Sequence, residues 1–308
     1  GTDDASGFHV PLIGREGEMS VLQAALSRIL TEKRGRLVLV IGDVGVGKSR
    51  LVGEFFRKLE SHTGEMVIFQ GRSDLRTAQI PYSYLRELLI THFQVNESDR
   101  LAAIEEKIVR QLGRAYTGEN PIDNDQLRDQ ARAISRLVIQ GALDRQHSEP
   151  GEVDGAEGRE QALNAVLKYL EDMARSRPTL FLLEDIHWID EGSLGLLERV
   201  CLSAADKPLL MIGLARPTFL EQRSNWPVGD DIPITRIMLQ PLNESRCREM
   251  AHAILRELPQ ISPEVIDHIV QTSAGNPFYV EELIRGLIED GIFAAYSADH
   301  SQGRSLQL

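Results

Sequence analysis

One eight-residue stretch constrains the fold of this chain more than any other. Residues 42–49 read Gly-Asp-Val-Gly-Val-Gly-Lys-Ser and match the pattern G-x-x-x-x-G-K-S/T. An apolar run, 37–41, precedes the stretch, and a segment with helical character, 50–60, follows it. Strand, glycine-rich loop and helix in this order predict a P-loop, which binds phosphate with backbone N–H groups and a helix N-terminus. The alternative, a plain glycine turn, rarely matches the pattern with these flanks.

Different residue types in this stretch are expected to bind different parts of the nucleotide and its metal ion. Glycines let the backbone curl so that its N–H groups point inward. Lys48 supplies a positive charge for the β- and γ-phosphates, and Ser49 supplies a hydroxyl for Mg²⁺. Lys48 is therefore both a binding and a catalytic candidate. The predicted nucleotide-binding residues of the loop are Gly42, Val44, Gly45, Val46, Gly47, Lys48, Ser49 and Arg50.

A second chemical element follows the apolar run 179–183. Glu184 and Asp185 come directly after it. Continuous apolar runs suit central parallel strands, and ligands of open α/β sheets bind at the carboxyl ends of such strands. One acid there can hold Mg²⁺ through water while the next polarises the attacking water. We expect Ser49, Glu184 and Asp185 at the metal, with both acids catalytic; the alternative is two solvated acids at a strand end.

Arginines provide further candidates. Arg216 leaves the apolar run 209–214 and can sense a γ-phosphate from there; alternatively, it is a surface residue that starts a loop. Arg128, Arg132 and Arg136 recur every four residues. We interpret these three as a solvated basic face, with a phosphate contact to a neighbouring molecule as the alternative.

The alternation of strand-like and helical segments predicts an α/β fold with a doubly wound, five-stranded parallel sheet. The predicted strands are 37–41, 66–70, 179–183, 209–214 and 232–239. After Pro241 the pattern becomes helical, and Ser262-Pro263 is a helix-start signal. We predict a flexible N-terminus (1–10), a P-loop domain (11–240), a helical lid subdomain (241–293), a loose tail (294–308) and a mobile acidic loop (147–160).

Charge and composition narrow the range of partners. The net charge of −12 over 308 residues is unfavourable for general nucleic-acid binding, so we expect no direct nucleic-acid contact. Two cysteines without metal or redox spacing suggest a reducing compartment. With no apolar run near 18 residues and no signal peptide, we expect a cytoplasmic protein without membrane contact. The chain begins without Met and reads as a piece of something longer.

Five stretches together resemble the AAA+-related STAND ATPases, in particular the ATPase modules of large LuxR-type transcription regulators and of bacterial adenylate-cyclase fusions. The matching stretches are Ile13-Gly14-Arg15-Glu16, the P-loop 42–49, "LLEDIHWID" at 182–190, Leu214-Ala215-Arg216-Pro217 and "GNPFYVEEL" at 275–283. They occur in the family's order and extend over about residues 10–292. The last stretch and "LLEDIHWID" make the resemblance specific, since the P-loop alone is common to many families.

The resemblance implies a signalling ATPase that binds ATP or ADP with Mg²⁺. It implies that Ile13, Gly14, Arg15 and Pro277 border the adenine and that Arg216 is the sensor. In this family ADP holds a closed state; ATP exchange opens the lid, permits self-association and switches on an attached effector. The partners would thus be sensor and effector regions outside this chain. Glu184 precedes Asp185, the reverse of the usual AAA+ order, so we expect slow hydrolysis.

Three functions remain open at this point. The first is an ATP- and ADP-binding, slowly hydrolysing switch that controls an effector such as a transcription-regulator or cyclase domain. The second is a nucleotide-dependent interaction module without meaningful turnover. The third is an AAA+ remodelling or DNA-loading ATPase, against which the acidic balance counts. Adenine is preferred over guanine because the chain contains no Asn-Lys-x-Asp motif.

Overall fold

A computed structural model describes residues 11–59, 66–96, 98–115, 123–143, 156–226, 232–256 and 261–289. The predicted flexible N-terminus, the tail from 294 and positions 147–155 of the acidic loop lie outside these ranges. The chain divides into two compact units. The P-loop unit comprises Gly1–Leu22, Ile41–Glu60 and Met238–Leu308, and the sheet unit comprises Gln23–Val40 and Ser61–Ile237. Each unit is described by itself below.

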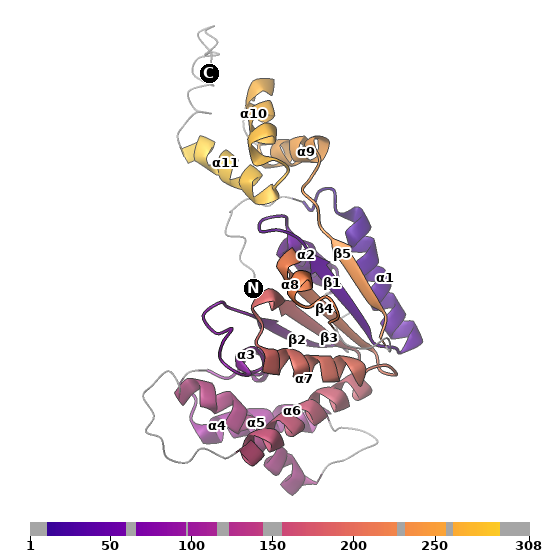
Figure 1. Cartoon of the computed structure of the whole chain (residues 1–308), viewed down its shortest axis with the longest axis vertical. Helices are drawn as coiled ribbons and strands as arrows, with labels where there is room; N and C mark the ends of the chain where they lie inside the picture. The colour runs from indigo at the N-terminus through magenta and orange to yellow at the C-terminus, as the bar shows by residue number, and fades with distance from the viewer. Residues whose placement is uncertain are drawn as a thin grey trace. The chain divides into compact units, whose positions relative to one another are not determined.

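The sheet confirms the predicted α/β class, with five parallel strands in the order β2-β3-β4-β1-β5 (Figure 1). The strands are β1 Arg36–Ile41, β2 Val67–Arg72, β3 Thr179–Glu184, β4 Leu209–Ala215 and β5 Ile234–Met238. Every residue of β3 and β4 is buried, as expected for apolar central strands. The β2–β3 register sets Arg72 beside Glu184 and therefore brings polar residues of β2 to the end of β3.

Four helices lie in the chain between β2 and β3: α3 Ser83–Phe93, α4 Leu101–Ala115, α5 Asn124–Leu143 and α6 Ala156–Ser176. Helix α6 begins three residues before the Arg159 expected from the sequence. An aromatic cluster links α3 and α6 to the sheet, with Phe69 stacked between His92 and Phe181 at ring-centroid distances of 4.1 and 4.7 Å. Phe69 and Phe181 are fully buried, so the cluster belongs to the sheet unit's core.

The remaining helices follow the strands closely in the chain. They are α1 Glu16–Glu32, α2 Lys48–Leu59, the short 3₁₀ helix η2 Ile186–Trp188, α7 Glu191–Leu202 and α8 Pro217–Gln222. The sequence patterns did not predict η2 or α8, since both are too short to show helical periodicity. None of the helices in the described ranges combines the length and apolar character that a membrane span requires.

The predicted lid helices are α9 Glu244–Ile254, α10 Pro263–Ser273 and α11 Pro277–Glu289. Their common core, within the P-loop unit, includes Met250, Ile269, Val280 and Ile284, together with Ile13 from the N-terminal loop. Ser262 caps α10 as predicted, because its side chain accepts a hydrogen bond from the backbone N–H of Val265. The helices thus begin and end at local signals, while apolar faces hold them together.

Candidate functional site

The P-loop consists of the six residues between β1 and α2 and the first two residues of α2. Two of its glycines have backbone angles that other residues rarely adopt, with φ of +81° at Gly45 and +96° at Gly47. Gly45 also has no room for a side chain, because a Cβ there would lie 2.5 Å from Oδ1 of Asn276. The loop therefore needs glycine at Gly45 for two reasons, backbone conformation and close contact with the residue before α11.

Lys48 opens α2 and folds back onto the loop. Its Nζ atom donates hydrogen bonds to the backbone carbonyls of Gly42 and Asp43, both at 2.8 Å. The ammonium group thus lies over the loop whose N–H groups are expected to bind phosphate. The exposed Ser49 follows at the N-terminal turn of α2, where the helix dipole favours an anion.

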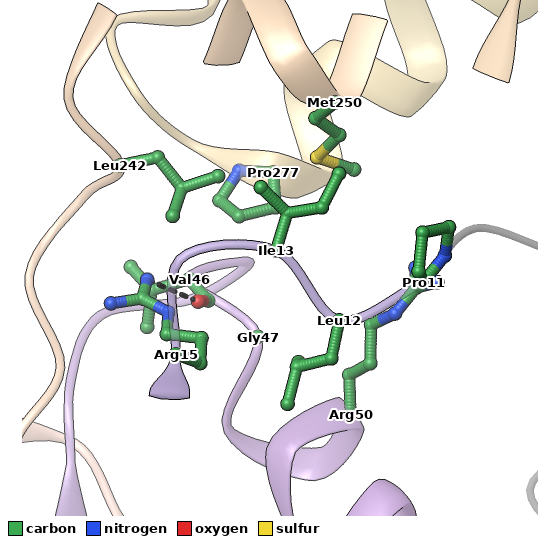
Figure 2. A pocket seen from close by; sticks show the side chains of 10 residues that line it. All are labelled: Pro11, Leu12, Ile13, Arg15, Val46, Gly47, Arg50, Leu242, Met250 and Pro277. Atoms are coloured by element: carbon green, nitrogen blue, oxygen red, sulfur yellow. Dashed lines mark hydrogen bonds between the residues drawn. The ribbon is translucent and has the colours of Figure 1, made fainter. Parts of the chain in front are cut away.

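Arg15 is buried and ties three segments of the P-loop unit together. Its Nη2 atom donates to the carbonyl oxygen of Val46 at 3.1 Å (Figure 2). Nη2 also donates to the carbonyl of Gln240 at 2.7 Å, and Nη1 donates to the carboxylate of Glu18. The resemblance predicted Arg15 beside the adenine. The structure adds a second role, because the guanidinium fixes the position of the P-loop carbonyl at Val46.

A pocket in the same unit brings together several of the predicted nucleotide-binding residues. Ile13, Arg15, Val46, Gly47, Arg50 and Pro277 all line it (Figure 2). The remaining lining residues are Pro11 and Leu12, which precede the predicted Ile13 in the same loop, and Leu242 and Met250, which sequence reasoning missed. Leu242 and Met250 carried no signal beyond apolar character. The apolar lining, with two arginines at its border, suits a flat aromatic base attached to phosphates.

The start of α11 contacts the tip of the P-loop. Nδ2 of Asn276 donates to the carbonyl of Val44 at 2.9 Å, and the backbone N–H of Phe278 donates to the carbonyl of Gly45 at 3.3 Å. One turn further along, Glu281 forms a 2.6 Å ion pair with Arg50. Neither Asn276 nor Glu281 was a candidate from the sequence, although both lie within the "GNPFYVEEL" stretch.

In the sheet unit, each of the two predicted acids has a partner from β2. Glu184 is buried, and its Oε1 accepts a 2.9 Å hydrogen bond from Nε2 of Gln70. Oδ2 of Asp185 accepts a 3.1 Å hydrogen bond from Nε of Arg72. Asp185 also has φ of +53°, a left-handed conformation that is uncommon outside glycine and that often marks a functional position.

Tyr84 lies beside these acids. Burial raises its pKa well above the ordinary value, and the negative charge of Glu184 raises the pKa further. The phenol therefore stays protonated and donates a 2.8 Å hydrogen bond to the carbonyl of Gly71. The bond fixes α3 to the end of β2 next to Gln70 and Arg72.

Asp190 anchors the segment that follows the acids. Its buried carboxylate accepts hydrogen bonds from the backbone N–H groups of Tyr82, Tyr84 and Ser193 at 2.7–3.2 Å. It also accepts from the hydroxyls of Ser83 and Ser193. One side chain thus caps both α3 and α7, which sequence reasoning did not foresee, because the α3 donors lie more than one hundred residues away in the chain.

Arg216, the predicted sensor, lies between β4 and α8. Its guanidinium carbon lies 6.0 Å from the ring centroid of Trp188, at the end of η2. This is the outer range of a cation–π contact. Of the arginine row on α5, Arg132 pairs with Asp129 at 3.4 Å on an exposed face, in keeping with a solvated surface.

Among the described residues, no group of three or more His, Cys, Asp or Glu side chains is placed to hold a metal ion. Mg²⁺ bound with a nucleotide does not need such a group, because phosphate oxygens and waters supply most of its ligands. The predicted set of one hydroxyl and two carboxylates has the oxygen chemistry that Mg²⁺ prefers. The metal assignment of Ser49, Glu184 and Asp185 therefore stays a prediction compatible with these residues.

Comparison with known proteins gives one family match and one curated relative. A family model described as AAA ATPase domain matches residues 11–212. An uncharacterized protein of Rhizobium meliloti (strain 1021) is 28% identical over 281 residues, which are 89% of this chain and 25% of that protein. The chain thus spans about a quarter of the length of this relative.

Solved structures described as ORC, ORC1 and ORC2 share the fold. The Drosophila ORC bound to DNA is 15% identical with a TM-score of 0.54, covering 93% of this chain and 58% of that chain. The Aeropyrum pernix ORC1 protein in complex with DNA is 15% identical with a TM-score of 0.54, covering 94% and 63%. The Aeropyrum pernix ORC2 protein in ADPNP–ADP complexes is 16% identical with a TM-score of 0.50, covering 98% and 67%. At these identities the likeness concerns the fold alone.

Proposed function

Because this chain belongs to the AAA ATPase domain family, we propose that it binds ATP and ADP at the P-loop and hydrolyses ATP slowly, as a regulatory switch. One observation carries the proposal. Val46 and Gly47 of the P-loop, and Arg50 in the first turn of α2, share a pocket with Pro277 at the start of the lid helix α11. A nucleotide in this pocket would contact both the P-loop and the lid helix. Nucleotide binding would therefore influence the position of the lid.

The residues divide into base-binding and phosphate-binding groups. The apolar wall formed by Ile13, Val46 and Pro277 suits adenine, and Gly14 turns the N-terminal loop toward this wall with φ of +66°. The loop N–H groups, Lys48 and the N-terminus of α2 suit the phosphates. Arg15 stabilises the site by donating a hydrogen bond to the backbone carbonyl of Val46.

The residues proposed for catalysis are Lys48 in the P-loop unit and Glu184, Asp185 and Arg216 in the sheet unit. The P-loop follows β1 and the acids follow β3, and both strands belong to one parallel sheet, whose carboxyl edge is where ligands of such folds bind. Mg²⁺ held by Ser49 and the acids would neutralise charge between the phosphates. Because Gln70 and Arg72 already engage the two acids, slow turnover is expected.

The switch part of the proposal rests on the resemblance to STAND ATPases. Sensor and effector regions outside this chain, ATP-dependent self-association, a cytoplasmic location and a lid boundary near residue 240 belong to the same proposal. That this chain spans a quarter of its curated relative is in keeping with attached regions.

Two alternatives have specific support. An interaction module without turnover is favoured by the hydrogen bonds that engage both acids. A DNA-loading ATPase is favoured by the fold, since two of the similar structures are described as bound to DNA or in complex with it. Against DNA loading stands the net charge of −12.

The first experiment identifies the bound nucleotide. Protein purified without added nucleotide is denatured, and the released small molecules are analysed; near-stoichiometric ADP would support a switch that retains its product. ATP, ADP and GTP are then titrated with Mg²⁺ against the wild type and Lys48→Ala. Lys58→Ala, at the exposed end of the same helix α2, is the matched control. Failure of all three nucleotides to bind, or unchanged ATP affinity in Lys48→Ala, would refute the proposal.

Two further assays separate the alternatives. Turnover no faster than that of Lys48→Ala, combined with tight nucleotide binding, would favour the interaction module. Affinity for DNA that falls steeply with salt would favour the DNA-loading ATPase.

A further inference from the structure

The start of α11 forms hydrogen bonds with backbone carbonyls of the P-loop, the loop proposed to bind phosphate. Asn276 and the N–H of Phe278 engage the carbonyls of Val44 and Gly45 at the tip of the loop. Oδ1 of Asn276 also accepts from the N–H of Phe278 at 3.1 Å, so the start of α11 is itself held in shape. The start of α11 is therefore attached to the loop by hydrogen bonds between uncharged groups.

The charged contact lies one turn further along α11. Glu281 and Arg50 form an ion pair at 2.6 Å, with side-chain exposures of 13% and 26%. Arg50 follows Ser49 in the first turn of α2 and lines the pocket. Its guanidinium is thus a cation at the border of the proposed nucleotide site, and a carboxylate from the lid neutralises it.

A phosphate group of the nucleotide could bind the same guanidinium of Arg50 that Glu281 binds. Guanidinium groups bind carboxylate and phosphate with the same planar pair of N–H donors, so the two anions compete for one arginine. Like charges also repel at short range, and a phosphate near Arg50 would meet the negative charge of Glu281. The pair is partly shielded from water, which limits the screening of both effects.

We propose that Glu281 competes with the nucleotide's phosphates for Arg50, so that nucleotide binding and attachment of α11 to the P-loop oppose each other through this residue. The inference rests on the proposed function and names the residue by which the lid would respond to the nucleotide. Loss of the Glu281 charge should therefore tighten nucleotide binding and loosen α11.

The test compares two neighbouring glutamates on one helix. Glu281→Gln removes the charge that faces Arg50. Glu282→Gln removes the same charge one residue later, where the carboxylate pairs with Arg285 of its own helix at 2.8 Å. The measurement is the ATP and ADP dissociation constant by calorimetry. We expect Glu281→Gln to bind roughly twofold to fivefold more tightly than the wild type, the upper part of the range for a partly exposed ion pair, and Glu282→Gln to match the wild type.

A second measurement needs no nucleotide. Hydrogen–deuterium exchange of the backbone over 276–284 should be faster in Glu281→Gln than in the wild type and in Glu282→Gln. Glu281→Asp, which keeps the charge on a shorter side chain, should fall between wild type and Glu281→Gln in both assays. Melting temperatures of the variants check that each is folded.

The outcomes distinguish this inference from the proposed function. If the wild type binds no nucleotide, the proposed function fails. The hydrogen–deuterium exchange comparison then still tests whether Glu281 attaches α11 to the P-loop. If the wild type binds ATP but Glu281→Gln binds with equal or lower affinity, the competition is refuted while the proposed function stands. Unchanged exchange over 276–284 would refute the attachment.

Discussion

The guanidinium of Arg72 binds the carboxylate of Asp185 at 3.1 Å, joining the last residue of β2 to the residue that follows β3. The parallel register makes this possible, because it sets Arg72 beside Glu184 and so within reach of the next side chain. The Arg72 side chain is 73% exposed, so the pair is screened by solvent and can exchange partners readily. A proposed catalytic acid thus has a competing cation close by.

Arg72→Ala is expected to raise ATP turnover by roughly threefold, because the Asp185 carboxylate becomes available to polarise water. Phosphate release at saturating ATP measures the effect. Arg76→Ala, in the exposed loop four residues later, controls for the loss of one positive charge. A decrease in turnover specific to Arg72→Ala would contradict this prediction and indicate that the pair holds Asp185 in its productive position.

Glu184→Gln and Asp185→Asn should each lower turnover at least roughly tenfold while ATP affinity stays near the wild-type value, since the acids act on metal and water. Steady-state phosphate release and nucleotide titration are measured in parallel. Glu191→Gln, at an 81% exposed position on α7, is the control. If both variants turn over ATP at the wild-type rate, the assignment of these acids to catalysis is wrong.

Asp190→Ala should destabilise the protein by roughly 3 kcal/mol, because it leaves buried backbone N–H groups of α3 and α7 without their acceptor. Asp190→Asn keeps one acceptor oxygen and should lose less stability than Asp190→Ala. Urea unfolding followed by circular dichroism gives the comparison. Asp206→Ala, whose side chain is 87% exposed, should unfold at the wild-type midpoint. Equal midpoints for Asp190→Ala and Asp206→Ala would show that the cap contributes little.

His92 should make stability depend on pH. Burial lowers its pKa from 6.5 to about 4, with a hydrogen bond to the backbone of Ile68 opposing part of the shift. Between these values the unfolded chain binds the proton and the folded chain does not, so stability falls as the pH drops through this window. The loss of folding stability approaches its full size, on the order of 3 kcal/mol, near the pKa of His92 in the folded protein. It does not grow at lower pH.

The measurement for His92 is the urea midpoint as a function of pH. His92→Gln, which does not titrate there, should show a shallower decline than the wild type. His268→Gln, at an exposed position on α10, controls for the loss of a histidine. A decline in His92→Gln as steep as in the wild type would assign the acid sensitivity to other groups.

The sequence alone predicted those parts of the fold and site that rest on local chemistry. The apolar runs gave the five strands, because a buried parallel strand must be apolar on both faces. The glycines, Lys48 and Ser49 marked the P-loop, because a phosphate-binding turn restricts residue types at fixed spacing. Ser262 marked the start of α10 for a similar local reason.

The tertiary structure decided which polar side chains meet. Arg15 reaches Gln240 across 225 residues, Arg50 reaches Glu281 across 231, and Gln70 reaches Glu184 across 114. No local pattern encodes such partners, because they depend on strand register and on how apolar faces of distant segments pack. The sequence by itself thus determined that this chain forms a P-loop on a parallel sheet. Only tertiary packing decided which side chains hold the P-loop, the acids and the lid helix, since hydrogen bonds form wherever packing brings buried polar groups together.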